Sequence, residues 1–332
     1  MAVPRTLNRI AFFGTPEFAV PALCALEAAG RRPVLVVSQP ARRAGRGGRL
    51  SQPPVARWAI DRGVDLLQPA GVRGADFLGR LRDLDLDLAV VAAYGRIFPR
   101  PLLELPAGGC VNIHASLLPA WRGASPIQAA IAAGEGTTGV TTMVMEEGLD
   151  SGPILLQEEV SIGQDETAGE LSPRLAAAGA ALLVRTIEAL EAGAVEPRAQ
   201  CDAAATHAPM LRSEDGIVDW SREAGEIAWR VRAYEPWPGS RSRLRGEAVR
   251  IVASRPLPSF DAVEGRGDLD RPGAFLGCRK VEGIGRLPVV RCGGSSALAL
   301  CRVQRPGGRQ ISGLDLINGL RLGVGERFGT AE

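Results

Sequence analysis

The sequence predicts an α/β domain with a mostly parallel sheet, followed by a small all-β domain that we expect to be a barrel. In the first 115 residues, short apolar runs alternate with helix-like segments, which is typical of parallel strands covered by helices. Beyond residue 217, short β-like runs recur between Gly and Pro residues instead. A chain of 332 residues is also long enough for two domains. We expect a first domain at 1–194, a linker at 195–212 and a second domain at 213–332.

The first domain should open with four buried strands. Their apolar runs lie at 9–13, 33–38, 87–93 and 109–114. Thr15, Pro16 and Glu17 suit the N-cap, the first helical position and the first turn of a helix, so we expect a helix to begin there. Residues 54–62 are expected to form the next helix.

Two strands and a long helix should complete this domain. The strands are expected at 138–145 and 152–157, joined by a polar turn. Thr167 and Glu170 have the spacing of a capping box, and Gly193 lies where a helix end is expected, so a helix should run between them. The second domain should contain strands near 248–253, 287–292 and 297–303.

Composition is that of a globular protein, with 45% hydrophobic and 23% charged residues. No apolar stretch reaches the roughly 18 residues of a membrane span, and the N-terminal apolar run is too short for a signal-peptide core, so a cytoplasmic location is expected. Six scattered cysteines without a C-x-x-C pair, and only two histidines, make a metal site unexpected. Residues 208–332 carry 20 basic and 15 acidic residues, which fits an anionic partner or simple solubility.

Asn112 and His114 are the first candidates for chemistry. They alternate on a predicted strand, so they face the same side, at the carboxyl end where open α/β sheets bind ligands. An amide and an imidazole can both donate hydrogen bonds to a developing oxyanion, and the imidazole can move a proton. Asp150, in the polar turn, could orient such a ring. The residues that follow the first strand do not have the G-x-G-x-x-G spacing of dinucleotide-binding proteins, which argues against a nicotinamide dehydrogenase.

The segment 112–119, N-I-H-A-S-L-L-P, followed by W-R-G and Pro126, resembles the formyltransferases that use 10-formyltetrahydrofolate. The turn at 148–152 resembles the aspartate loop of that family. Three further segments resemble the branch of the family that formylates the methionine on initiator tRNA, and they lie at 13–18, 39–47 and 232–238. The resemblance runs in order from about residue 9 to the C-terminus.

This resemblance implies a Rossmann-like catalytic domain, a C-terminal OB-like barrel that binds tRNA, and specific roles for site residues. It implies Asn112, His114 and Asp150 as catalytic residues. It implies a folate site lined by Ser116, Leu117, Leu118 and Pro119, with Tyr94 and Gly95 in a loop beside the pterin. It also implies initiator methionyl-tRNA as partner and 10-formyltetrahydrofolate as formyl donor, without a metal or an obligatory protein partner.

Four arginines, Arg42, Arg43, Arg46 and Arg49, lie in a Gly-rich segment that we expect to be a flexible loop folding around RNA. Without the resemblance, such a charge run is typical of a solvated surface loop. Arg46, between two glycines, aligns with the arginine of the family. One departure is Met210, where the family usually has a lysine; the chain has one lysine, Lys280.

Two alternatives share parts of this pattern. A formyltransferase acting on an amino-sugar nucleotide would contain the same Asn112, His114 and Asp150. The arginine segment and the basic second domain argue against it. A non-catalytic RNA-binding module built on an enzyme fold is the other alternative, and the intact set of catalytic residues argues against that.

Overall fold

The structure, a computed structural model, describes residues 6–44, 49–257 and 269–329. The chain forms two compact units, which are described separately. The first unit comprises 1–126, 137–161 and 171–209, and the second comprises 127–136, 162–170 and 210–332. Among the described residues, no helix is both long enough and apolar enough to cross a membrane.

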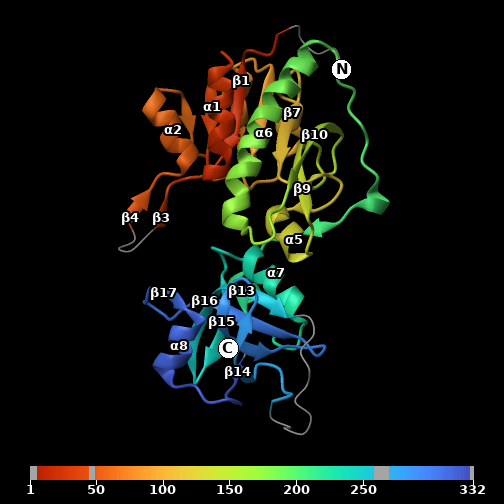
Figure 1. Ribbon diagram of the computed structural model, residues 1–332. Helices are drawn as coiled ribbons and strands as arrows, with labels where there is room; N and C mark the ends of the chain where they lie inside the picture. Colours follow the sequence, from red (N-terminus) through yellow and green to blue (C-terminus); the bar gives the residue numbers. More distant parts are fainter. Residues whose placement is uncertain (1–5, 45–48, 258–268, 330–332) are drawn as a thin grey trace. The chain divides into compact units, whose positions relative to one another are not determined.

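The first unit is built on a mixed sheet in which parallel strands predominate (Figure 1). Its parallel strands are β1 (Ile10–Gly14), β2 (Leu35–Val37), β5 (Leu66–Leu67), β6 (Leu88–Ala92) and β7 (Cys110–His114). Two longer strands extend one edge in the antiparallel sense, β9 (Thr137–Val144) and β10 (Ile154–Ser161). The spatial order is β10-β9-β7-β6-β1-β2-β5, so the chain winds outward in both directions from β1 and β6.

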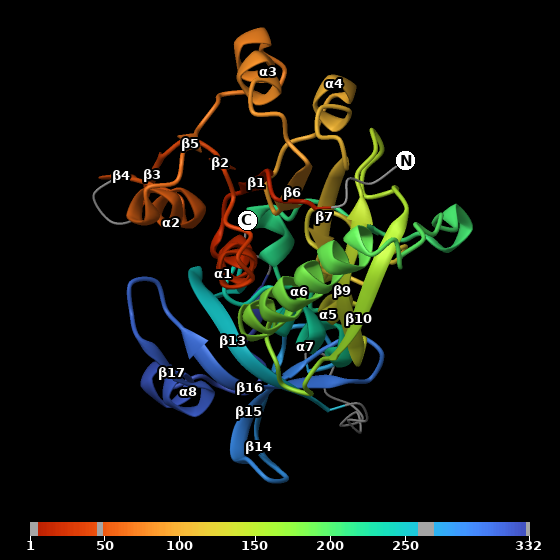
Figure 2. The ribbon, with the colours of Figure 1, turned by 90° about the horizontal axis from the view of Figure 1, so that it is seen from above.

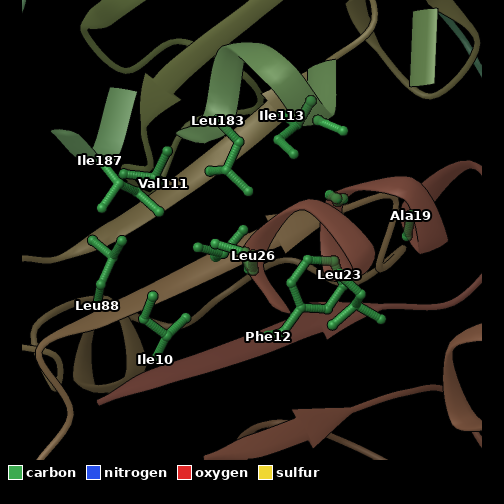
Figure 3. Close-up of a cluster of buried hydrophobic side chains, with 14 of the residues drawn as sticks. Ile10, Phe12, Ala19, Leu23, Leu26, Leu88, Val111, Ile113, Leu183 and Ile187 are labelled. Atoms are coloured by element: carbon green, nitrogen blue, oxygen red, sulfur yellow. The ribbon is translucent and has the colours of Figure 1, made fainter. Parts of the chain in front are cut away.

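Helices cover both faces of this sheet (Figure 2). One face packs against α1 (Val20–Ala28), α2 (Pro54–Arg62) and α6 (Ala168–Glu191). Figure 3 shows this layer, where Leu23 and Leu26 of α1 and Leu183 and Ile187 of α6 meet side chains of the strands. The other face packs against α3 (Ala75–Arg82) and the short α4 (Arg100–Leu103). Because both faces are buried, β1, β6 and β7 are apolar along most of their length, as parallel strands usually are.

The predicted α/β fold is confirmed, and the predicted capping box at α6 is present. Thr167 N donates to Glu170 Oε2 at 2.9 Å, and Glu170 N donates to Thr167 Oγ1 at 3.3 Å. Gly193 follows the helix with φ +62°, a left-handed conformation suited to glycine at a helix end.

The predicted helix cap at Thr15 is wrong. A short 3-10 turn, η1 (Glu17–Ala19), precedes α1, and the residue at its N-cap is Pro16. The Thr15 hydroxyl instead lies between two strand ends, donating to Tyr94 O and accepting from Gln39 N, each at 3.4 Å. The hydroxyl therefore forms hydrogen bonds with residues distant in sequence, and not with the first turn of the helix as the local spacing predicted.

The arginine segment also differs from the expected flexible loop. Its described part is an antiparallel pair of strands, β3 (Arg42–Ala44) and β4 (Arg49–Ser51). The pairing joins Arg42 with Ser51 and Arg43 with Leu50, so backbone hydrogen bonds give order to a sequence that cannot bury an apolar face. Residues 45–48, and with them Arg46, lie outside the described residues.

The chain after α6 does not leave the first unit at once. Arg198 forms an antiparallel bridge with Ile154, and β11 (His207–Ala208) pairs in parallel with β8 (Arg122–Gly123). A 3-10 turn, η2 (Asp202–Ala204), lies between them. Residues 195–209, which carry no periodic pattern in the sequence, are therefore held along the same unit as the sheet.

The second unit contains an antiparallel sheet that closes on itself. The strands are β12 (Ser240–Leu244), β13 (Glu247–Leu257), β14 (Phe275–Val281), β15 (Gly285–Arg291), β16 (Ala297–Gln304), β17 (Gln310–Ser312) and β18 (Phe328–Gly329). Their order is β14-β15-β16-β13-β12-β18, with β17 beside β16. A bridge between Ala274 and Arg327 joins the two end strands, as the predicted barrel requires.

Helices also occur in this second unit, although only strands were predicted for residues 213–332. They are α5 (Pro126–Ala132), whose first residue ends the first segment of the first unit, α7 (Ala224–Ala233) and α8 (Gly313–Leu320). A 3-10 turn, η3 (Ser213–Gly216), precedes α7. In α7 the buried residues Ala224, Ile227, Ala228 and Val231 follow the helical period. Two of them are alanines, so the apolar stripe is narrow and has little signal in the sequence.

Candidate active site

The site is organised by β7, whose five residues are all buried. Val111 and Ile113 face the layer that contains α1 and α6 (Figure 3). Cys110 packs in the opposite layer, and since strand side chains alternate, Asn112 and His114 lie on its side. The strand thus brings an amide and an imidazole to one face at its carboxyl end, as the sequence predicted.

Asp150 lies in the turn after β9, and the antiparallel pairing of β9 with β7 continues to a hydrogen bond from Met145 N to Cys110 O of 2.8 Å. Asn112 Nδ2 donates to Asp150 Oδ1 at 3.4 Å, and His114 Nδ1 lies 3.6 Å from Asp150 Oδ2. The same Oδ2 accepts a hydrogen bond from Gly123 N at 2.9 Å. One carboxylate therefore connects two side chains of β7 with the backbone of Gly123.

The imidazole of His114 is held at both of its nitrogens. Nε2 lies 2.9 Å from Trp121 O, and because a carbonyl oxygen only accepts, Nε2 carries a hydrogen. Nδ1 faces Asp150, so a second proton there would give an imidazolium beside a carboxylate. The side chains of His114 and Asp150 are only 6% and 15% exposed, which reduces the screening of this pair by water.

The segment that follows His114 is fixed by polar contacts to β9. Ser116 is fully buried, and its hydroxyl donates to Ala120 O at 2.6 Å. Thr141 Oγ1 donates to Ser116 O at 2.6 Å and accepts from Leu118 N at 3.1 Å. Leu118 is also buried, in a small cluster with two neighbouring apolar side chains. Leu117 and Pro119 remain partly exposed, so of the four residues predicted to line a folate site these two present side-chain surface.

Tyr94 and Gly95 follow β6, the strand next to β7. The Tyr94 ring is buried in the core and contacts Phe13 and Phe98 edge to face. Burial raises the pKa of its hydroxyl to about 12, and the hydroxyl has no hydrogen-bond partner among the described residues. Tyr94 can meet a ligand only through its backbone, whereas Gly95 is exposed and has open space where a side chain would be.

The predicted tRNA-binding arginines lie elsewhere in the first unit. Arg42 and Arg43 have exposed side chains on β3, and Arg49 begins β4. Gln68, which follows β5, connects the two ends of the β3–β4 pair to the sheet. Its Nε2 donates to Gln39 O, before β3, and to Gln52 Oε1, after β4, both at 2.9 Å. Within residues 6–44, 49–257 and 269–329, no three His, Cys, Asp or Glu side chains are arranged to hold a metal ion.

Comparison with known proteins identifies this arrangement. Residues 8–187 match the model of a family described as formyl transferase, and residues 210–321 match that of the formyl transferase C-terminal domain. The methionyl-tRNA formyltransferase of Anaeromyxobacter dehalogenans is 49% identical over 94% of this chain and 97% of its own length. That of Methylococcus capsulatus is 43% identical over 97% of this chain and all of its own.

The chain belongs to the methionyl-tRNA formyltransferase family. Solved structures share its fold at lower identity. An N-formyltransferase from Helicobacter canadensis, solved with folinic acid and dTDP-3-aminofucose, superposes with a TM-score of 0.62 at 15% identity, over 88% of this chain and 98% of that one. HypX from Aquifex aeolicus, solved with tetrahydrofolic acid, gives 0.59 at 16% over 96% of this chain, which spans about half (48%) of HypX.

Several contacts at the site were not predicted from the sequence. The carbonyl of Trp121 and the amide of Gly123 contact His114 and Asp150 through the backbone, which any residue type could supply. Gln200 donates to two carbonyls of the Asp150 loop from a segment without periodicity. The W-R-G string had drawn attention to Trp121 and Gly123, but no sequence pattern predicted a role for Gln200.

Proposed function

We propose that this chain transfers the formyl group of 10-formyltetrahydrofolate to the amino group of methionine on initiator tRNA. The proposal rests on the carboxylate of Asp150, which contacts both Asn112 and His114 in a chain of the methionyl-tRNA formyltransferase family. The amide, the imidazole and the carboxylate supply the hydrogen-bond donors and the proton carrier that formyl transfer to an amine needs. We therefore assign the chain to the cytoplasm, where it would encounter charged initiator tRNA.

In such a transfer, an amine adds to a formyl carbon, so negative charge develops on the formyl oxygen and positive charge on the amine nitrogen. Asn112 Nδ2 uses one hydrogen for Asp150 and has a second that can be donated to this oxygen. His114 in its imidazolium form stabilises the same charge electrostatically. Removal of one such donor typically lowers the rate by ~10²–10³.

The amine must also lose a proton, and the departing nitrogen must gain one. His114 Nδ1 is the ring nitrogen that can exchange a proton, since Nε2 is bound to the Trp121 carbonyl. Asp150 compensates the charge of the ring whenever it carries both protons. General acid–base transfer of this kind contributes ~10²–10⁴ to a rate. The same pair can serve both proton movements in turn.

The surroundings of β6 and β7 fit a folate donor. Gly95 offers exposed backbone and open space at the carboxyl end of β6, and Leu117 and Pro119 present partly exposed apolar surface after β7. Leu149, next to Asp150, is 60% exposed. A pterin is planar and carries hydrogen-bonding edges, so it suits exposed backbone flanked by apolar side chains. When bound, the donor supplies the formyl group, and these residues hold it near Asn112.

The tRNA is assigned to two basic regions. Arg42, Arg43, Arg46 and Arg49 would contact the acceptor end, and the C-terminal domain at 213–332 would bind more of the tRNA. The segment 195–212 would link it to the catalytic domain at 1–194, with residues up to 209 held along the first unit. The exposure of Arg42 and Arg43 on a paired strand supports the first part of this assignment. The excess of basic residues after residue 208 supports the second.

A transfer assay tests the proposal directly. The purified chain is supplied with 10-formyltetrahydrofolate and, in parallel, with charged initiator tRNA or with an amino-sugar nucleotide. Formylation of the methionyl-tRNA alone is the expected result. Formylation of the sugar nucleotide instead would establish the alternative enzyme, and tRNA binding without transfer to either acceptor would indicate a binding module.

A further inference from the structure

The side chain of Gln200 is bound at every polar position it has. Nε2 donates to Asp150 O at 2.8 Å and to Gly152 O at 2.7 Å, so both amide hydrogens are used. Oε1 accepts from Arg122 Nε at 3.0 Å. The residue lies after α6, in the segment that runs alongside β8, and it is far in sequence from both loops that it joins.

The loop that Gln200 holds has an unfavourable backbone conformation. Asp150 has φ +50°, in the left-handed region that non-glycine residues rarely adopt. Gly152 approaches β9 so closely that a Cβ there would lie 1.9 Å from Val144 O. Conformations of this kind persist only where surrounding contacts enforce them. The two hydrogen bonds from Gln200 fall on the carbonyl of Asp150 itself and on that of Gly152, so they act directly on this turn.

The other side of Gln200 is anchored to Arg122, whose neighbour Gly123 binds the Asp150 carboxylate. Arg122 is buried, and besides Gln200 it binds Asp202, with its Nη2 donating to Oδ1 at 2.8 Å. Gly123, the next residue, donates its N–H to Asp150 Oδ2. A Cβ at Gly123 would lie 2.5 Å from Ala208 O, so β11 fixes the position of this amide. The segment 198–208 therefore holds the backbone of Asp150 through Gln200 and its carboxylate through Gly123.

We infer that Gln200 is a positioning residue for formyl transfer, which acts by holding Asp150 in the left-handed turn that places its carboxylate between Asn112 and His114. The inference rests on the proposed function. It adds that the segment after α6 is part of the catalytic machinery. The hydrogen bonds of Gln200 join it to Asp150 O, Gly152 O and Arg122 Nε, and not to Asn112 or His114, so its effect passes through Asp150. Misplacement of a catalytic group by about 1 Å can lower a rate by ~10².

The test compares Gln200→Met with a matched control. Methionine keeps the length and approximate volume of glutamine and removes all three hydrogen bonds. Thr186→Val is the control, because Thr186 is a buried residue of the same unit whose hydroxyl donates to Leu182 O at 2.7 Å and contacts Thr142 Oγ1 at 2.8 Å, in the layer opposite the site. Each variant is measured for kcat, for KM of both substrates and for melting temperature.

Gln200→Met should lower kcat for tRNA formylation by ~10–10² and change either KM by less than about threefold. Thr186→Val should lower the melting temperature but leave kcat within about twofold. If Gln200→Met keeps the parent kcat, or if both variants lose kcat in proportion to their loss of stability, the positioning role is wrong. Where Gln200→Met does not fold, Gln200→Asn replaces it, because asparagine keeps the amide but withdraws it by one methylene.

A double-mutant cycle separates action through Asp150 from a general structural effect. In an Asp150→Asn background, measured in single turnover with excess enzyme, Gln200→Met should cost less than about threefold further. A repeat of the full ~10–10²-fold loss in that background would overturn the inference. A parent chain that formylates neither acceptor would instead refute the proposed function. In that case the ring ¹⁵N signals of His114, one of two histidines, still report whether Gln200→Met displaces Asp150.

Discussion

Replacement of Asp150 by asparagine is the most informative single change at the site. The carboxylate accepts from two donors, Asn112 Nδ2 at Oδ1 and Gly123 N at Oδ2, and it faces His114 Nδ1. An amide of the same shape has one acceptor oxygen. Whichever way the new side chain is turned, its NH2 group must face one of those two donors. Asp150→Asn therefore removes the charge and also disrupts one hydrogen bond.

The size of the effect follows from the geometry. For a charged ring and a carboxylate 3.6 Å apart, an effective dielectric constant of about 20 gives an attraction of about 4–5 kcal/mol. If the imidazolium is needed only in the transition state, loss of this attraction lowers the rate by ~10³. A buried donor left without an acceptor costs about 1–3 kcal/mol, mostly in stability.

The assay is a single-turnover transfer from 10-formyltetrahydrofolate to charged initiator tRNA. We expect Asp150→Asn to lose between ~10² and ~10⁴ of the rate, in line with general acid–base catalysis. Folate affinity should stay within a few-fold of the parent, because among the described residues the partners of the Asp150 carboxylate are Asn112, Gly123 and His114, and not Gly95, Leu117 or Pro119. A melting curve shows whether the variant is folded. A folded variant that transfers formyl groups within a few-fold of the parent rate would refute the role of Asp150.

Further variants test the remaining assignments. His114→Ala and Asn112→Ala should each lose at least ~10²-fold in single-turnover rate with folate binding retained, and either one staying near the parent rate would contradict its role. Changing Arg42, Arg43, Arg46 and Arg49 together to Ser should leave melting temperature and folate affinity unchanged but weaken tRNA binding, with the salt dependence flattened by roughly 0.7–0.9 log units per lost phosphate contact. Arg46→Ala should cost more activity than Arg42→Ala, and transfer at the parent rate by the fourfold variant would reopen the amino-sugar alternative. Tyr94 ionises near 10 in an unfolded chain and at about 12 in the folded one, so the folded state loses stability as the pH rises through that range. Tyr94→Phe should reduce this alkaline loss without lowering stability at pH 8, because the hydroxyl has no partner among the described residues; denaturant titrations at pH 8 and pH 11 check both points.

The layered α/β fold and the strand that carries Asn112 and His114 could be predicted from the sequence, because their signals are local. Apolar runs in β1, β6 and β7 follow from burial on both faces of the sheet. The capping box of α6 is a spacing of three residues. The alternation of side chains along a strand alone places Asn112 and His114 on one face. The helix α7 was missed because its buried face is narrow and partly alanine.

The completed site required the tertiary structure. Thr15 does not cap a helix, because its hydroxyl has two backbone partners, Tyr94 O and Gln39 N, at the ends of two strands. The arginine segment forms paired strands through backbone groups, which do not depend on residue type. His114 is held by a carbonyl, and the Asp150 turn by an amide side chain from beyond α6. Contacts of this kind depend on which backbone segments lie side by side in the folded chain, and not on residue type or on the periodicity of the sequence. The sequence alone therefore determined the layered fold and which polar side chains share one face of β7, whereas only the folded chain decided what holds them in place.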